Sequence, residues 1–110
     1  CFSDDLYREK FICIFLNGRN EVIATETLFE GSLTTSAVYP REVIRRILHH
    51  GSAAVLFCHN HPSGNPEPSQ DDLIITKKLK DACNTIDVSV HDHLIIAGTE
   101  YTSFTERGLI

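Results

Sequence analysis

Hydrophobic and polar positions alternate along this 110-residue chain in short blocks. The first blocks along the chain predict strands, and the first helical pattern comes after them. The run from Lys10 to Leu16 is apolar on both faces, which is typical of a central strand. Asn17-Gly18-Arg19-Asn20 then forms a predicted hairpin turn, followed by a returning strand from Glu21 to Phe29. Residues 31–39 are rich in Ser and Thr and predict either a further strand or a loop.

Two helical patterns follow, separated by one strand. Pro40 suits the first position of a helix, where its missing N–H costs nothing, and Gly51 suits the end of that helix. One apolar stripe runs along this helix, formed by Val43, Ile44, Ile47 and Leu48. Residues 53–58 predict a short buried strand, and residues 62–68 predict a rigid loop. The second helix runs from about Ser69 to Thr85, with apolar residues at helical spacing, namely Ile75, Leu79, Ala82, Cys83 and Ile86.

The last third of the chain predicts a long strand over residues 87–97, a turn at Gly98-Thr99-Glu100 and a final strand over residues 101–105. The expected order is therefore β-β-(β)-α-β-α-β-β. This order predicts a single α/β domain over residues 1–110, with a mixed sheet and two main helices packed on it.

Composition narrows the function classes. Hydrophobic residues make up 42% and charged residues 23%, which is ordinary for a soluble globular domain. No apolar stretch approaches the ~20 residues of a membrane span, and the start of the chain lacks the features of a signal peptide. We therefore expect a cytoplasmic protein. The net charge of −5 argues against direct nucleic-acid binding by this domain. Because the chain has no methionine, even at its start, we expect a fragment of a longer chain.

The cysteines predict no zinc ribbon, because none of them forms a Cys-x-x-Cys pair. Cys13, Cys58 and Cys83 lie in apolar patterns, so we expect them to be buried, reduced thiols. The fourth cysteine, Cys1, is the first residue of the chain. Strand alternation turns Cys58 away from its neighbour His59, and we do not expect it to bind metal.

The candidate chemistry lies directly after the central buried strand, at His59-Asn60-His61. Side chains two residues apart on a strand point the same way, so both imidazoles can bind one metal ion. Asp72 can supply a third ligand once the loop folds back. Two histidines, one carboxylate and an open position are typical of a catalytic zinc site. Ser69 and Asp72 also fit a helix capping box, and the two roles are compatible.

The spacing of His59, His61, Ser69 and Asp72 resembles the JAMM motif of the MPN/JAB metallopeptidase family. The segments around it, beginning with His61-Pro62-Ser63-Gly64, resemble more narrowly the RadC family of bacterial proteins, which are historically labelled as DNA repair factors. Further matching segments are Phe15-Leu16-Asn17, Glu30-Gly31-Ser32-Leu33, Val38-Tyr39-Pro40-Arg41-Glu42, Asp92-His93-Leu94-Ile95-Ile96 and Glu106-Arg107-Gly108-Leu109. The resemblance implies a JAMM/MPN-like, cytidine-deaminase-like three-layer fold. It also implies a small helical domain upstream, similar to DNA-binding helix-hairpin-helix modules.

The resemblance also implies roles for single residues. His59, His61 and Asp72 would hold Zn²⁺, and Ser69 would help to stabilise the tetrahedral intermediate of amide hydrolysis. The general base would be Glu9, which precedes the first core strand, while Glu26 and Glu30 are alternatives on the second strand. Glu42 is more typical of a structural residue near the start of a helix.

Two other histidine pairs stay open. His91-Asp92-His93 repeats the spacing of the main motif and predicts either a second metal site or a group that supports the fold or a metal ligand. His49-His50 suits a helix C-terminus.

Two functions compete. One is a zinc metallopeptidase or isopeptidase acting on a peptide or protein, and the other is a non-catalytic scaffold linked to DNA repair or recombination. A homodimer is compatible with either function. A deaminase is excluded, since the chain lacks His-x-Glu and Pro-Cys-x-x-Cys motifs.

Overall fold

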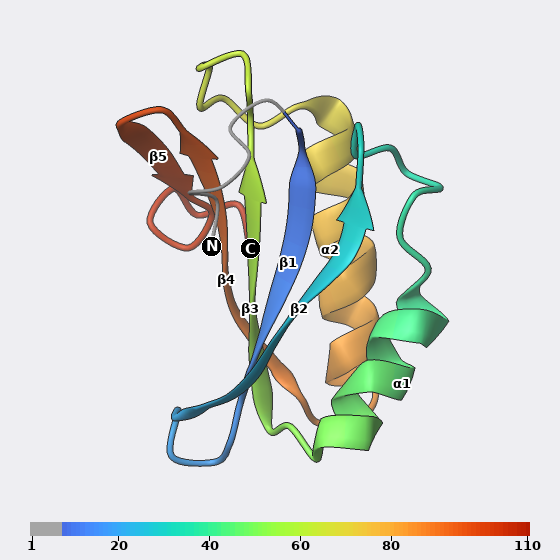
Figure 1. Cartoon of the computed structure of the whole chain (residues 1–110). Helices are drawn as coiled ribbons and strands as arrows, with labels where there is room; N and C mark the ends of the chain where they lie inside the picture. Colours follow the sequence, from blue (N-terminus) through green and yellow to red (C-terminus); the bar gives the residue numbers. More distant parts are fainter. Residues whose placement is uncertain (1–7) are drawn as a thin grey trace.

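A five-stranded mixed sheet carries two helices in the computed structural model, which describes residues 8–110 (Figure 1). The sheet has the strand order β2-β1-β3-β4-β5. The pair β3–β4 is parallel and the other pairs are antiparallel, so the predicted mixed sheet is confirmed. The strands are β1 (Lys10–Leu16), β2 (Val22–Glu30), β3 (Ala54–Asn60), β4 (Ser89–Ala97) and β5 (Glu100–Ser103).

The hairpin between β1 and β2 forms where the sequence predicts it. The Asn17 Oδ1 atom accepts hydrogen bonds from the backbone N–H groups of Arg19 and Glu21, at 2.9 and 3.0 Å. Asn20 has a φ of 61°, a left-handed conformation that asparagine tolerates better than most residues. The turn therefore sets the strand pairing through local side-chain chemistry.

The helices α1 (Pro40–His50) and α2 (Gln70–Asn84) begin and end within one residue of their predicted limits. Pro40 occupies the first turn of α1 as predicted. Gly51 ends that helix with a φ of 65° and donates its N–H to the carbonyls of Ile47 and Leu48. Ser69 caps α2. These three boundaries are each encoded by a single residue, two through backbone preference and one through side-chain capping.

Residues 31–39 form a loop and turns, so of the two structures predicted for them the loop is the correct one. Other strand limits shift slightly, with β4 beginning at Ser89 rather than at residue 87 and β5 ending at Ser103 rather than at residue 105. Asp87 has a φ of 57°, which places it in the turn before β4.

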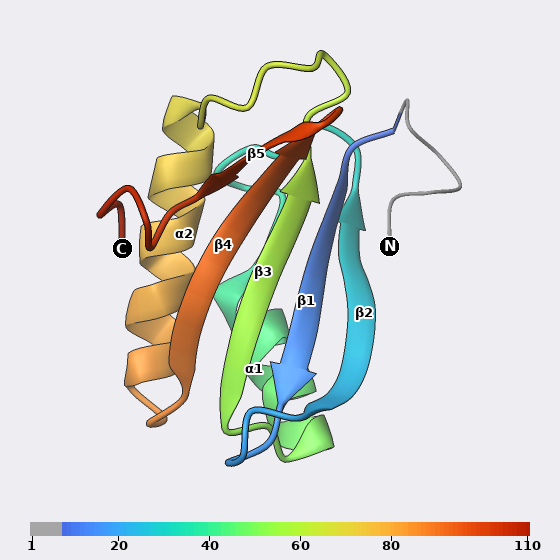
Figure 2. The same cartoon turned by 90° about the vertical axis from the view of Figure 1, so that its left-hand side faces the viewer.

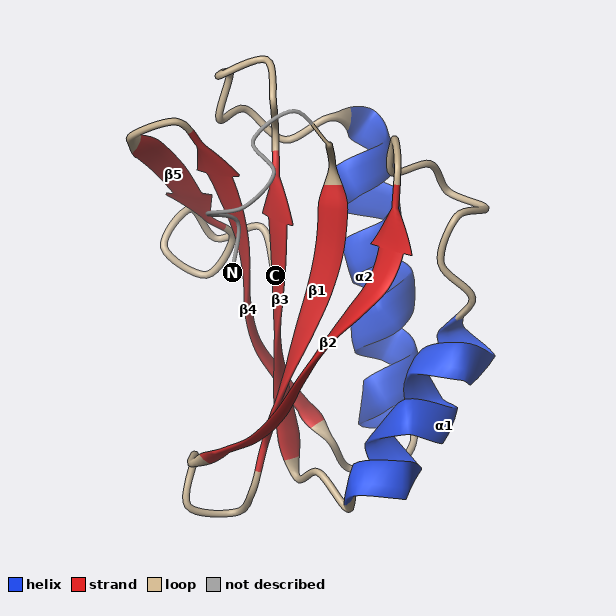
Figure 3. Ribbon diagram, viewed as in Figure 1, coloured by secondary structure: helices blue, strands red, loops and turns tan. Residues whose placement is uncertain are grey.

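Both helices lie on the same face of the sheet, which corrects the three-layer expectation for the described residues (Figures 2 and 3). The reason is topological. The connections β2-α1-β3 and β3-α2-β4 each join parallel strands and advance in the same direction across the sheet. Crossovers of one hand that advance in one direction place their helices on one face. Residues 8–110 therefore form two layers, a sheet and a pair of helices.

The core lies between these two layers. It contains aromatic side chains of β1 and β3, namely Phe11, Phe15 and Phe57, packed with Ile47 of α1 and Leu79 of α2. Cys13, Cys58 and Cys83 are buried and free, as predicted, while Cys1 lies outside the described residues. Burial raises the pKa of the Cys58 and Cys83 thiols to about 11. No helix within residues 8–110 has the length and apolar character that crossing a bilayer requires.

Two adjacent residues of α1 test where this core lies. Ile47 is 1% exposed and Leu48 is 67% exposed. We expect Ile47→Ala to lower the free energy of unfolding by about 2–4 kcal/mol, because it removes buried methyl groups and leaves a cavity. Leu48→Ala should change it by less than about 0.5 kcal/mol. Urea unfolding measures both, and equal losses from the two variants would contradict the assigned helix face.

Candidate metal centre

Four parts of the chain meet at one end of the sheet. The C-terminal ends of β2 and β3, the start of β1 and the N-terminus of α2 all lie there, with the loop of residues 61–69 above them (Figure 1). The carboxyl ends of parallel strands in α/β proteins commonly carry binding sites, because the crossover loops converge there. The predicted metal ligands come from two of these parts.

His59 and His61 point to the same side, as their spacing predicts. His59 is in β3 and is 1% exposed. His61 follows the strand, and its backbone N–H still bonds to the carbonyl of Ile96 in β4, at 2.8 Å. Their ring centroids are 4.7 Å apart and nearly perpendicular, at 84°. The strand and its parallel neighbour therefore hold both imidazoles next to each other.

Asp72 reaches the histidines from the first turn of α2. The Ser69 hydroxyl accepts the Asp72 N–H at 3.0 Å, and the Asp72 Oδ2 atom accepts the Ser69 N–H at 2.8 Å, which is the predicted capping box. Asp72 is 1% exposed. The capping box fixes its carboxylate in the position that faces the two histidines.

The three side chains form a compact donor set. The distance from His61 Nε2 to Asp72 Oδ2 is 3.1 Å, and the distance from His59 Nδ1 to Asp72 Oδ1 is 3.7 Å. One ligand atom from each residue lies within 4.8 Å of the other two. Such a group could bind a metal ion. It is the one cluster of this kind that residues 8–110 contain.

Hydrogen bonding shows how this cluster could hold a cation. The Nδ1 atom of His61 lies 2.8 Å from the carbonyl of Asn65, so Nδ1 must carry a hydrogen to donate. The Nε2 atom of a neutral His61 then turns a lone pair towards the Asp72 carboxylate. A proton or a metal ion must lie between them to avoid repulsion. In the metal-free protein the hydrogen bond to Asp72 raises the pKa of His61.

Burial sets the direction of the pKa shift at His59, whereas hydrogen bonding sets it at Asp72. Burial lowers the pKa of His59, which favours the neutral imidazole that a metal requires. Burial alone would raise the pKa of Asp72, but hydrogen bonds from His61 and from the Ser69 backbone outweigh it and lower that pKa. The Nδ1 atom of His59 is buried and has no hydrogen-bond partner within the described part of the chain. A buried polar atom of this kind fits a site completed by a further group.

Glu9 is the predicted base that lies beside the cluster. Its Oε2 atom is 3.5 Å from the Nε2 atom of His59 and also accepts the Leu33 N–H at 3.2 Å. Glu9 immediately precedes β1, whose Phe11 pairs with His59 of β3. The strand pairing thus brings this carboxylate to the cluster across 50 residues of sequence.

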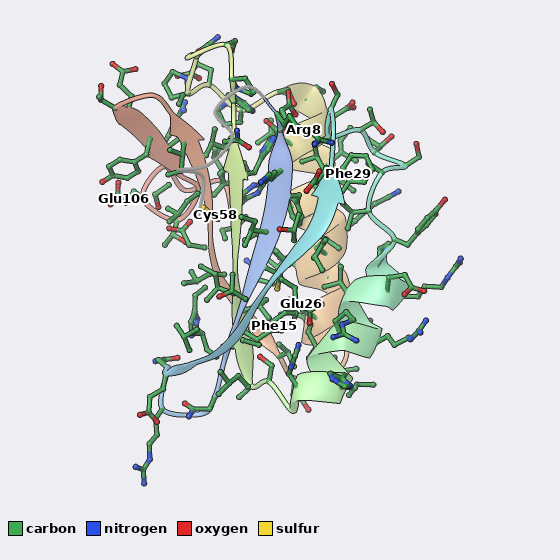
Figure 4. The ribbon with its side chains drawn as sticks, viewed as in Figure 1. Arg8, Phe15, Glu26, Phe29, Cys58 and Glu106 are labelled. Atoms are coloured by element: carbon green, nitrogen blue, oxygen red, sulfur yellow. The ribbon has the colours of Figure 1, made fainter. Side chains whose placement is uncertain are left out.

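The alternative glutamates have other partners. Glu26 accepts three hydrogen bonds from Arg46, two from Nε at 3.0 Å and one from Nη2 at 2.8 Å, and it also contacts His50. The hydrogen bond from Arg46 is the main reason that the pKa of Glu26 is lowered. Figure 4 shows Glu26 beside α1, well below the end of the sheet where Arg8 lies. Glu30 forms an ion pair with Arg8 at 3.0 Å.

Glu42 and the histidine pair at the end of α1 also lie outside the cluster. Glu42 forms an exposed ion pair with Arg45 at 3.3 Å. His50 packs on the ring of Phe15, with centroids 4.6 Å apart, while His49 is exposed. His49 and His50 lie in the last turn of α1, as the sequence predicts, and Glu42 lies in its first turn.

The segment His91-Asp92-His93 does not form a second metal site with other described residues. His91 is exposed, and its Nε2 atom lies 2.8 Å from Asn20 Oδ1. The Asp92 carboxylate accepts hydrogen bonds from the Ser103 hydroxyl at 2.5 Å and from the His93 N–H at 2.8 Å. His93 is fully buried and contacts Thr76. The β3–β4 pairing skips His91, because Val55 pairs with Val90 and Leu56 pairs with Asp92. This irregularity in the register separates the exposed His91 from the buried His93.

An open groove of about 960 Å³ lies over the cluster. One wall comes from residues 30–34 and the other from residues 61–63, 65 and 67–69, while Glu9 and Asp72 lie between them. The sequence predicts a rigid loop over residues 62–68, in the second wall, but it does not predict a groove. The pairing of β1 with β2 carries residues 30–34 to this end of the sheet, and the family-like segment Glu30-Gly31-Ser32-Leu33 was a further signal.

The sequence matches the RadC-like JAB domain family over residues 2–109. A UPF0758 protein of Nitrosospira multiformis is 56% identical over 102 residues, which cover 93% of this chain and 46% of that protein. A UPF0758 protein of Vibrio vulnificus is 48% identical over 106 residues, which cover 96% of this chain and 47% of that protein. The chain thus spans about half the length of these relatives. It belongs to the RadC family of JAB domains.

Proposed function

We propose that the chain is a zinc-dependent metallopeptidase or isopeptidase that hydrolyses an amide bond in the groove above His59, His61 and Asp72. The observation that carries the proposal is the arrangement of these three ligands beside Glu9, at the base of an open groove. An open groove of about 960 Å³ suits an extended segment of a peptide or protein. The peptide or protein substrate, the functional domain over residues 1–110 and a homodimer stay predictions.

The donor set fits zinc. Imidazole nitrogen and carboxylate oxygen are common zinc ligands, and three protein ligands leave a position open, as in catalytic sites. When bound, zinc supplies a Lewis acid that polarises a carbonyl and makes a water molecule more acidic. His59, His61 and Asp72 would hold it, and the neutral state of His59 favoured by burial suits this role.

Glu9 is placed to move a proton. Its Oε2 atom faces His59 at the edge of the groove, so it can accept a proton from a water molecule there. An amide nitrogen leaves poorly unless it is protonated, and the same carboxyl group can then donate that proton to the nitrogen. The backbone N–H of Leu33 holds the carboxylate in place.

Ser69 is placed to stabilise negative charge. Its hydroxyl oxygen accepts the Asp72 N–H, and within residues 8–110 its own hydrogen has no acceptor. That hydrogen is free to point into the groove, which Ser69 lines. Donation to the carbonyl oxygen as it becomes negative would lower the barrier.

A non-catalytic interaction module linked to DNA repair or recombination is the second candidate. One face of the sheet carries no helix of the described residues, and Ile14, Leu56 and Ile96 are only half-buried. Such a face suits protein contact. The complete ligand set favours the hydrolase, because a scaffold has no need for three ligands with a carboxylate beside them.

We expect close to one zinc ion per chain in protein prepared without chelators. The double variant His59→Ala/His61→Ala should lose it, because only one of the three ligands remains. His49→Ala, at an exposed position on α1, is the matched control and should keep it. Elemental analysis measures all three proteins, and metal at the wild-type level in the double variant would show that the site is wrong.

The domain should fold without metal. Its core includes Phe15, Phe57 and Leu79, which are buried outside the cluster, unlike the core of a zinc finger. Thermal unfolding after chelation should remain cooperative, with the transition shifted down because the ion stabilises only the folded state. A random-coil circular dichroism spectrum after chelation would instead identify the metal as structural.

Glu9→Gln should lower amide hydrolysis roughly a hundredfold or more, since the variant keeps the size of the side chain but loses the basic oxygen. Its zinc content should stay unchanged. Glu42→Gln, an exposed change on α1, should leave both quantities unchanged. The assay is a screen of peptide libraries with the wild-type protein, followed by kinetics on any substrate found. A wild type that loads zinc but cleaves nothing would favour the interaction module.

A further inference from the structure

His93 lies directly behind the metal cluster without belonging to it. It is 0% exposed, and its ring stacks on Phe104 at a centroid distance of 4.5 Å and an angle of 25°. The rings of His93 and Phe11 lie nearly perpendicular to each other, with centroids 5.6 Å apart. The centroid of the His59 ring lies 5.8 Å from that of His93. One of the aromatic rings around His93 is therefore that of His59, a proposed metal ligand.

His93 also connects to Asp72 through one hydroxyl group. The Thr76 Oγ1 atom lies 2.6 Å from His93 Nδ1 and 2.7 Å from the backbone carbonyl of Asp72. Thr76 follows Asp72 by four residues on α2, so both lie on one face of the helix. It is 1% exposed.

The hydrogens in this chain can be assigned. The Thr76 hydroxyl has one hydrogen, and a carbonyl can only accept, so Thr76 donates to Asp72. The Nδ1 atom of His93 must then donate to Thr76, which leaves Nε2 as a bare acceptor. Within residues 8–110 that Nε2 atom has no partner, and a buried acceptor without a partner is tolerated better than a buried N–H.

We propose that His93 is a positioning residue for the metal site. Its Nδ1–H fixes Thr76, and Thr76 fixes the first turn of α2, from which Asp72 extends. Its ring supports His59 from behind. One buried side chain on β4 thus sets the separation between ligands that come from β3 and α2. The inference rests on the metal site proposed above.

A role limited to core packing makes a different prediction. A phenylalanine at position 93 would keep the ring and its stacking on Phe104 while losing the nitrogen that bonds to Thr76. If packing were the whole role, His93→Phe would bind metal as the wild type does. Thr76→Val is the complementary change, since valine has the shape of threonine without the hydroxyl.

The experiment titrates Co²⁺ alone into metal-free wild type, His93→Phe, Thr76→Val and the double variant, in competition with a chromophoric chelator. We expect each single variant to bind Co²⁺ about 10–100-fold more weakly, as for other groups that orient metal ligands. The double variant should be no weaker than the poorer single variant, because both changes break the same connection. The visible absorption bands of bound Co²⁺ should shift in each variant, since they report ligand geometry.

Ile47→Ala is the matched control for loss of stability, because it lies on α1 and outside the cluster. It should bind Co²⁺ with wild-type affinity and give the wild-type spectrum. His93→Phe leaves no buried N–H unpaired, so it keeps the test decisive if Thr76→Val does not fold. Wild-type affinity and spectrum in His93→Phe would overturn the inference while leaving the metal site intact. A wild type that binds no Co²⁺ would overturn the metal site, and the inference with it.

Discussion

The capping box at the start of α2 is the interaction on which the candidate site depends. Asp72 must satisfy a backbone N–H at the helix terminus, and that requirement alone would explain its presence. The same oxygen lies 3.1 Å from His61. A local requirement of helix formation thus places a charged group in a buried position beside two imidazoles. The long-range site is built from a short-range constraint.

The sheet provides the second half of this arrangement. The pairing of β1 with β3 brings Glu9 beside His59, and the parallel pairing of β3 with β4 brings His93 behind it. Each of these three side chains comes from a different strand or strand end. The relative position of Asp72 depends on α2, which crosses from the end of β3 to the start of β4. The geometry of the cluster is therefore a consequence of one crossover connection.

Electrostatics explains why such a buried group can persist. A carboxylate and two histidines out of water are costly unless their hydrogen-bonding atoms are paired. Here the backbone carbonyl of Asn65 accepts a hydrogen bond from His61, and the backbone N–H of Ser69 donates one to the Asp72 carboxylate. The lone pair of His61 facing the Asp72 carboxylate is satisfied only by a cation. The same arrangement that would be unstable with no cation is well suited to binding one.

The sequence by itself determined most of the elements and the candidate donor set. Short apolar runs and helical spacing located the strands and helices. Pro40, Gly51 and Ser69 indicated helix limits, and the spacing of His59 and His61 put them on one strand face. These features are local, so a chain without coordinates reveals them. The third layer was predicted wrongly, because the face that a helix covers depends on the direction of its crossover. Glu9 could not be separated from Glu26 by spacing alone, and Thr76 and the groove wall at residues 30–34 went unnoticed. Their places follow from strand register and helix packing, which only the tertiary structure decided, since these contacts join residues far apart in the chain.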